Sequence, residues 1–218
     1  MLSCYITERR QLAGCEAERR KGLLKLMGEA SAAGVDYIRL NEYDLTTREL
    51  ESLATEALQV IRGEGLSRLL IGHRTDVALA VGADGVNLTH GDIAASEARA
   101  IAAKVRESYF VVSADCQTAA EVRLADSHGA DFALLGPAFG EGSIGLSLLR
   151  EAAQKDRTPD LRVEAGDTRR RFSVFAHGGV SLERASLCAI AGAAGIAGTR
   201  LFQQCEDFRR LVNALRAL

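Results

Sequence analysis

The sequence lacks any uninterrupted apolar run long enough to cross a membrane. Its first residues also lack the apolar stretch of a secretion signal, because Glu8, Arg9 and Arg10 interrupt that region. These absences argue against a membrane protein and against export. We expect a cytoplasmic protein with no membrane partner.

A basic stripe and a cluster of aromatic and basic residues are missing as well. Lysine and arginine number 27 against 29 aspartates and glutamates, which gives a net charge of -2. Proteins that bind nucleic acid concentrate positive charge on one face to meet the phosphates. The balance therefore argues against a nucleic-acid partner and favours a small-molecule ligand.

Metal-ligand spacing is absent among the five cysteines. An odd number of scattered cysteines is typical of reduced thiols and argues against a disulfide framework. One of them, Cys116, lies beside Asp115 at the expected end of a strand, where a nearby histidine could activate it as a nucleophile. The others are expected to pack in the core: Cys4, Cys15, Cys188 and Cys205.

What the sequence does contain is a repeated junction. Four helix-like stretches end in a glycine, followed by alanine or valine, usually an aspartate, and then an apolar run. Glycine suits such a junction because it adopts positive φ without a Cβ clash. The first three junctions lie about 48 residues apart, roughly the length of two strand-plus-helix units. The junction glycines are Gly34, Gly82, Gly129 and Gly192.

Apolar runs alternate with helical periodicity along the whole chain. The runs predict strands at 2–7, 37–40, 69–72, 85–88, 110–113, 132–136, 172–176 and 195–198. Helices are predicted at 47–61, 93–105, 118–127, 146–154 and 182–190, among others. Eight parallel strands alternating with helices predict an α/β fold, a single-domain (β/α)8 TIM barrel over residues 1–218. A doubly wound open sheet is the alternative.

One interval is longer than the others. The distance from Gly129 to Gly192 exceeds the other gaps by roughly 16 residues. The excess falls in 155–171, a charged segment before the seventh strand that ends in three arginines. It predicts a solvated surface loop on the face opposite the chemistry. An arginine patch that attracts a partner or a phosphate is the alternative.

The ends of the last two strands carry a candidate anion site. In a (β/α)8 barrel the active site lies at the carboxyl ends of the strands, and the loops after strands seven and eight commonly hold phosphate. His177, Gly178 and Gly179 follow strand seven, and Gly198 and Thr199 end strand eight. Adjacent glycines before a helix let backbone N–H groups converge on an anion. We predict a phosphate site here; a mere tight turn is the alternative.

Several short segments follow one another in a characteristic order, and together they span most of the chain. They are Tyr5-Ile6-Thr7, the segment 34–42, Arg74-Thr75-Asp76 running to 82–88, Val112-Ser113, the segment 129–139, and His177-Gly178-Gly179-Val180. No single segment is specific. In this order and spacing the sequence resembles the thiamine phosphate synthase and thiazole tautomerase (TenI-like) superfamily.

The resemblance implies an enzyme that joins a pyrimidine-methyl diphosphate to a thiazole phosphate, with pyrophosphate leaving on magnesium. It places one magnesium aspartate at Asp92, so Mg2+ is the expected cofactor. A second aspartate would stand where this chain has His73, and an asparagine where it has Gly72. Such chemistry needs carboxylates for the metal and cations for the departing charge.

Further departures affect the expected diphosphate site. Residues 39–43 replace a Gln-Leu-Arg-Glu-Lys segment, so the lysine is absent and the arginine has moved to Arg39 or been lost, with Asn41 in its place. An arginine inside a barrel needs an opposite charge, so either Glu42 or an anionic ligand should meet Arg39. Glu141 stands in the loop where the superfamily grips pyrophosphate with threonines and a lysine. Diphosphate and magnesium binding should therefore be weakened.

The tautomerase branch needs only a thiazole phosphate site and a base. Its histidine beyond strand five is Asp115 here, a weak base unless burial raises its pKa. His73 or His90 could take over that role. Ser113 matches a substrate-contacting position, or it is simply a small inward residue.

The resemblance thus predicts a thiamine phosphate synthase-like transferase that acts on a small phosphorylated substrate. Two alternatives are a TenI-like thiazole tautomerase or divergent phospho-ligand isomerase, and a non-catalytic barrel that binds such a ligand. Asp92 could instead cap a helix, and His73 could pack where a helix begins. A homo-oligomer is compatible with the sequence. The expected catalytic residues are Asp92, His73, Ser113 and Asp115, and the expected substrate- or phosphate-binding residues are Arg39, Asn41, Gly136, His177, Gly178, Gly179, Gly198 and Thr199.

Overall fold

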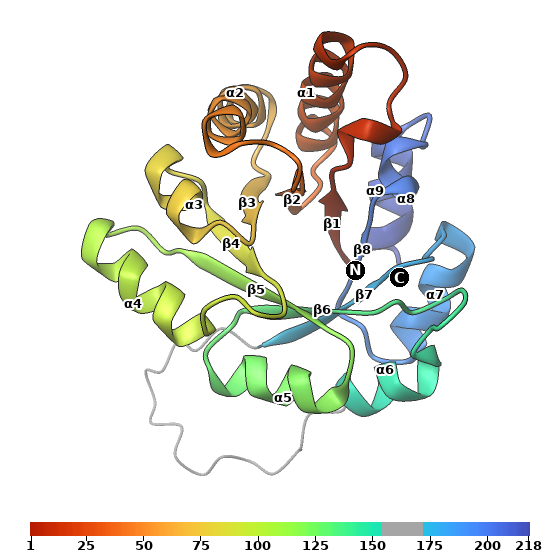
Figure 1. Ribbon diagram of the computed structural model, residues 1–218. Coiled ribbons are helices and arrows are strands. Elements are labelled where there is room, and N and C mark those ends of the chain that lie inside the picture. Colours follow the sequence, from red (N-terminus) through yellow and green to blue (C-terminus); the bar gives the residue numbers. More distant parts are fainter. Residues whose placement is uncertain (154–171) are drawn as a thin grey trace.

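Eight parallel strands form one closed barrel at the centre of the molecule (Figure 1). The computed structural model describes residues 1–153 and 172–218. The strands follow one another in chain order, and β8 pairs with β1 to close the ring. The strands are β1 (Leu2–Ile6), β2 (Tyr37–Leu40), β3 (Arg68–Gly72), β4 (Gly85–Leu88), β5 (Val111–Cys116), β6 (Phe132–Leu135), β7 (Ser173–His177) and β8 (Gly195–Gly198).

Helices surround this barrel on the outside, as Figure 1 shows. Each of the first seven strands leads into one major helix before the next strand begins. The helical segments are η1 (Arg9–Gln11), α1 (Glu16–Ala32), α2 (Thr47–Glu64), α3 (Thr75–Val81), α4 (Ala95–Val105), α5 (Ala119–Ser127), α6 (Gly145–Ala153), α7 (Leu182–Ile190), α8 (Arg200–Gln203) and α9 (Phe208–Arg216). The predicted (β/α)8 barrel is confirmed, and the open sheet is wrong. No described helix has both the length and the apolar character of a membrane span.

The four predicted junctions have the backbone conformation that glycine favours. Gly34, Gly82, Gly129 and Gly192 have φ of 86°, 71°, 81° and 98°, in the left-handed region. Side chains with a Cβ adopt this region at a cost, whereas glycine does not. The repeated glycine therefore ends each helix and redirects the chain into the next strand.

Alternation along the strands separates two apolar clusters. One side of each strand packs against the helices, and the other fills the barrel interior. Three rings dominate the interior: Phe132 lies 4.8 Å from Tyr37 and 4.6 Å from Phe175 between ring centroids. The interior cluster consists of Cys4, Ile6, Leu70, Val111, Phe132, Leu134, Phe175 and Ala197, with Tyr37 packed against it. These apolar side chains fill the barrel interior, and we call the end at the carboxyl ends of the strands, where the cleft described below lies, its open end.

The two ends of the sequence lie close together (Figure 1). The Met1 ammonium group donates a hydrogen bond of 2.7 Å to the carbonyl of Leu215. Phe208 of α9 packs against Tyr5 of β1, with ring centroids 6.3 Å apart. The last helix therefore covers the first strand.

Local differences from the sequence prediction affect the site. Strand β5 extends to Cys116, so Asp115 lies within the strand. His73 does not begin a helix: its φ is 48°, and α3 begins at Thr75 after Arg74 at the N-cap. Asp92 does not cap α4, whose N-cap is Ala94. The predicted loop at 155–171 lies outside the described residues.

Candidate functional site

A set of polar side chains lines the open end of the barrel. Because side chains alternate along a strand, those that share a face with the interior apolar cluster point into the barrel. Arg39 lies two residues after interior Tyr37, and Ser113 and Asp115 continue the face of interior Val111. Asn87 stands opposite Ser113 on the neighbouring strand. We call these four residues, Arg39, Asn87, Ser113 and Asp115, the inner wall.

Hydrogen bonds connect the inner wall into one network. Ser113 Oγ donates to Asn87 Oδ1 at 2.7 Å, and Asn87 Nδ2 donates to Asp115 Oδ1 at 3.1 Å. Arg39 Nη1 donates to the same Asp115 oxygen at 2.8 Å. The amide of Asn87 can bridge a hydroxyl and a carboxylate because it offers both an acceptor and donors. The network therefore fixes the orientation of Asp115.

Arg39 is a buried cation whose partner differs from the predicted one. Its side chain is 3% exposed and forms an ion pair with Asp115, while its second terminal nitrogen donates to the Tyr43 hydroxyl at 2.6 Å. Burial alone would lower the pKa of Arg39, but the charges of Asp115 and Tyr43 oppose it and the net direction is upward. Arg39 therefore stays charged. Glu42 was one expected partner, but it binds Arg9 instead.

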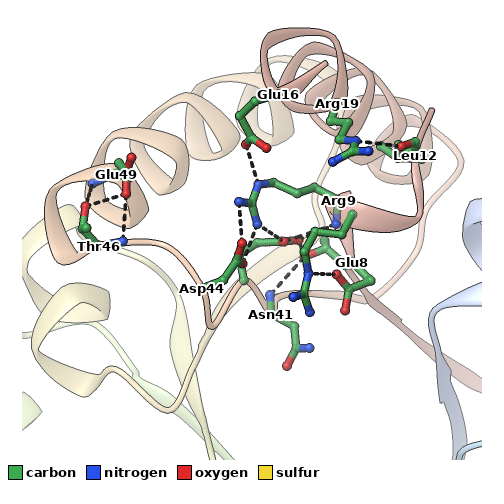
Figure 2. Close-up of polar contacts among 12 residues, drawn as sticks. Glu8, Arg9, Leu12, Glu16, Arg19, Asn41, Asp44, Thr46 and Glu49 are labelled. Atoms are coloured by element: carbon green, nitrogen blue, oxygen red, sulfur yellow. Dashed lines mark hydrogen bonds and ion pairs between the residues drawn. The ribbon is translucent and has the colours of Figure 1, made fainter. Parts of the chain in front are cut away.

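Two polar atoms beside the inner wall have no hydrogen-bond partner in the described part of the chain: Arg39 Nε and Asn41 Oδ1. The backbone N–H of Asn41 donates to Thr7 Oγ1 at 3.0 Å, which holds the residue in place. Figure 2 shows its side chain directed away from Arg9 and Asp44. A Cβ on Gly72 would lie 3.6 Å from Asn41 Oδ1 and 3.7 Å from Arg39 Nε. The absence of a side chain at Gly72 thus leaves space beside both atoms.

His73 lies beside this space rather than on a helix. Its ring packs on the ring of Tyr43 with centroids 4.6 Å apart and an interplanar angle of 30°. The same Tyr43 accepts a hydrogen bond from Arg39. His73 and Tyr43 therefore form one edge of the site, next to the inner wall.

A cleft of about 690 Å³ opens between the loops that follow β6, β7 and β8. Among the described residues, its lining contains the two arginines Arg184 and Arg200 and no carboxylate. Five of the predicted phosphate-binding residues line the cleft, namely His177, Gly178, Gly179, Gly198 and Thr199. Gly136 does not line it. The remaining lining residues are Gln11, Phe139, Gly140, Val180, Ser181, Leu201 and Gln204. The cleft is therefore suited to an anion.

The turn after β7 requires glycine at two successive positions. Gly178 and Gly179 have φ of 80° and 65°. A Cβ would lie 2.9 Å from Pro137 Cα at Gly178 and 2.4 Å from the Phe139 carbonyl oxygen at Gly179. Within residues 1–153 and 172–218, the amides of Gly178, Gly179 and Val180 donate to no protein group. They are free to bind a ligand.

Arg184 supplies positive charge beside this turn. It lies in the first turn of α7, where it donates to the Gly179 carbonyl at 3.1 Å. Its guanidinium stacks over the Phe139 ring, 5.0 Å from the centroid. Cation–π stacking and one hydrogen bond hold the head group at the cleft while leaving donors unused.

His177 connects the cleft to the inner wall. Burial lowers the pKa of His177 below its usual 6.5, the charge of Asp115 opposes that shift, and Arg39 adds to it. The imidazole is therefore neutral at pH 7. A neutral imidazole can accept a proton at one nitrogen and donate one from the other.

Asp92 does not form a magnesium site with its neighbours. Its Oδ2 accepts from the backbone N–H of Thr89 at 2.6 Å and from Thr89 Oγ1 at 2.9 Å, so it closes the loop after β4. His73 stands where a second carboxylate was expected, and the described residues contain no cluster of three candidate ligands. Magnesium favours oxygen ligands, mainly carboxylates. The residues present do not fit the ion.

Cys116 and His90 are poor candidates for the chemistry. Cys116 is buried among the residues that pack toward the helices, and burial raises its pKa to about 12, with smaller contributions from Glu121 and Asp115. A thiol of that pKa is not a nucleophile at neutral pH. His90 is exposed in the loop after β4.

Asn87 and Arg184 are two of the site residues that were absent from the sequence prediction. Asn87 was visible as a polar residue inside the apolar run 85–88, where every second side chain points inward. Arg184 carried no such signal, because an arginine in the first turn of a surface helix is ordinary. Its role depends on Phe139 and Gly179, which the sequence does not place beside it.

Comparisons with known proteins agree with this geometry. Residues 11–202 match the family described as "Thiamine monophosphate synthase". A putative thiamine-phosphate synthase of Geobacter sulfurreducens is 32% identical over 213 residues, covering 98% of this chain and 92% of that protein. A putative thiamine-phosphate synthase 2 of Aquifex aeolicus is 32% identical over 188 residues, covering 84% and 90%.

Solved structures give the same result. A thiamine phosphate pyrophosphorylase from Pyrococcus furiosus superposes with a TM-score of 0.77 at 26% identity, covering 99% of this chain and 94% of that one. A 3-hexulose-6-phosphate synthase superposes with a TM-score of 0.66 at 19% identity, which reflects the fold alone. With a closed barrel, a glycine turn beside the cleft and a family match over most of its length, the chain belongs to the thiamine monophosphate synthase family, a family of transferases.

Proposed function

We propose that this protein is a thiamine phosphate synthase-like enzyme of thiamine biosynthesis that acts on a thiazole phosphate. The observation that carries the proposal is the cleft at Gly178 and Gly179, whose free amides and two arginines suit a phosphate dianion. Phosphate bound there leaves the thiazole ring directed toward the inner wall. The enzyme would act in the cytoplasm on small phosphorylated substrates.

The proposed reaction joins the thiazole nitrogen to the methylene carbon of a pyrimidine-methyl diphosphate. A C–N bond forms, the C–O bond to the diphosphate breaks, and pyrophosphate leaves with the bonding electron pair. Most of the barrier is charge separation, so cations near the leaving group matter most. Arg184 and Arg200 supply positive charge at the cleft. Asn41 and Glu141 replace groups expected to bind the diphosphate, and His73 replaces an aspartate expected to bind magnesium. We infer that this chain binds the diphosphate more weakly than the resemblance implies.

A second candidate is proton transfer on the thiazole phosphate, as in a tautomerase. The observation that favours it is the pair of Asp115 and neutral His177, which interact electrostatically at the open end of the barrel. One group could remove a proton from the thiazole and the other could return it. This reaction needs neither a diphosphate site nor a metal donor set.

Two assays on the full chain separate these functions. The first supplies both thiamine precursors, with and without Mg2+, and measures thiamine phosphate and pyrophosphate. The second incubates a thiazole phosphate in D2O and follows loss of ring and side-chain proton signals by NMR. Product in the first assay supports the synthase; exchange without product supports the tautomerase. Binding without either reaction would reject both and leave a ligand-binding barrel.

A further inference from the structure

We propose that Asp115 is a built-in counter-ion that keeps anionic ligands away from Arg39, so that the inner wall accepts a neutral group. The inference deepens the proposed function, in which the phosphate binds at the glycine turn instead. Asp115 would then be a specificity-determining residue that selects against a second phosphate group beside β2. Three observations support it.

The first observation is how completely the charge of Arg39 is matched. Its side chain is 3% exposed, and Asp115 Oδ1 lies 2.8 Å from one terminal nitrogen. The other terminal nitrogen donates to Tyr43. Within the described part of the chain, only Nε of this guanidinium is left without a partner, and an anion that bound there would meet a cation whose charge Asp115 already neutralises, so it would gain little unless Asp115 were displaced.

The second observation is that Asp115 cannot easily move away. Its Oδ1 also accepts from Asn87 Nδ2 at 3.1 Å, and Asn87 is in turn held by Ser113 at 2.7 Å. Asn87 and Ser113 are fully buried, so this support is rigid. Displacement of Asp115 would leave the amide of Asn87 with one fewer acceptor.

The third observation concerns the polar atoms that remain available. Arg39 Nε is a donor and Asn41 Oδ1 an acceptor, both are buried without a partner among the described residues, and both border the space above Gly72. Buried polar groups are normally paired, so unpaired ones beside an open space indicate a ligand or water. A neutral group with an acceptor next to a donor would satisfy both, whereas a phosphate monoester dianion has no donor for Asn41.

The inner wall differs in charge from the cleft between the loops after β6, β7 and β8, which we call the outer cleft. Arg184 and Arg200 line that cleft, and no carboxylate lines it in residues 1–153 and 172–218, so a phosphate is favoured there. The inner wall instead contains one cation and one anion in direct contact. Charge thus assigns the phosphate to the outer cleft and the neutral group to the inner wall.

Isothermal titration with pyrophosphate in EDTA tests the inference on the full-length protein without turnover. Asp115→Asn keeps the shape but removes the negative charge, so pyrophosphate should bind at least about 10-fold tighter than in the wild type. The double variant Asp115→Asn/Arg39→Met should lose that gain. Asp126→Asn, the same change on exposed α5, is the matched control and should leave binding unchanged.

If Asp115→Asn is too unstable to titrate, Asp115→His at pH 8 also removes the negative charge. Histidine is the residue that the tautomerase branch has at this position. Equal pyrophosphate affinity in folded Asp115 variants and wild type would overturn the inference. Loss of wild-type pyrophosphate binding in Arg39→Met alone would also overturn it, because Arg39 would then already bind anions. A parallel titration compares inorganic phosphate binding to the wild type and to Arg184→Met, and it tests the outer cleft. Equal phosphate affinity in these two proteins would contradict the proposed function but not the inference about Asp115.

Discussion

At the scale of the residue, the glycine turn shows how backbone conformation and ligand binding depend on the same positions. Gly179 combines a φ of 65° with a backbone oxygen 2.4 Å from where a Cβ would be. The turn can therefore present its amides only if no side chain is present. A substitution here should affect both stability and binding.

We expect Gly179→Ala to destabilise the protein by about 1–3 kcal/mol and to weaken phosphate binding about 10-fold or more. Urea unfolding and titration with inorganic phosphate measure the two effects. Gly63→Ala is the control, because Gly63 lies in helix α2 with nothing within 4 Å of its Cβ position. That variant should be neutral or slightly stabilising. Equal phosphate affinity in both variants would argue against the glycine turn as the anion site.

A second residue-scale prediction concerns His177 and pH. Burial lowers the pKa of His177 in the folded state below 6.5, so the unfolded chain binds more protons as the pH falls. Stability should therefore decrease as the pH falls from about 7 to 5, and His177→Gln should reduce that decrease. Urea unfolding at several pH values measures both slopes. The prediction is wrong if the two proteins have parallel pH profiles.

At the scale of the element, Arg9 joins the start of the chain to the loop after β2 (Figure 2). Its guanidinium pairs with Glu16 of α1 at 2.6 Å, with Asp44 at 2.6 Å and with Glu42 at 3.1 Å. The side-chain hydrogen bond from Arg9 lowers the pKa of Asp44 to about 2, although the Asp44 side chain is partly exposed. The cluster holds residues 41–44, which include Asn41 and Tyr43, against η1.

We expect Arg9→Met to destabilise the protein by roughly 3 kcal/mol, because the fully buried Glu42 carboxylate would lose its charge partner. Thermal unfolding provides the measurement. Arg10→Met removes the neighbouring exposed ion pair to Glu8 and should leave the midpoint within error. Similar midpoints for the two variants would show that the buried cluster contributes little.

At the scale of the whole molecule, ligand binding and stability are linked by the outer cleft. A ligand that binds only the folded barrel stabilises it in proportion to the logarithm of its concentration. Thiazole phosphate at about 100 times its Kd should raise Tm by about 5–10 °C. Arg184→Met should reduce this shift at the same concentration, and the unliganded Tm should change little because Arg184 is exposed. An unchanged shift would remove Arg184 from the site.

The sequence predicted the closed barrel and most strand bounds, because alternation and junction glycines are local signals. Strands 37–40, 85–88 and 195–198 have the predicted bounds. The site was only partly predictable. The partner of Arg39 is Asp115, 76 positions further along the chain, and no local pattern connects them. His73 likewise has a positive φ before α3 begins and packs on Tyr43, so its predicted place at the start of a helix was wrong.

The pairing of β1 with β8 has a consequence for how the protein is made. Residues 2–5 find half of their backbone partners only in residues 195–198. On a translating ribosome, at about 5–20 residues per second, the first strand must wait on the order of 10–40 s with one edge unsatisfied. Chaperones that cover nascent β edges should therefore matter more for this protein than for one whose early strands pair with their immediate neighbours.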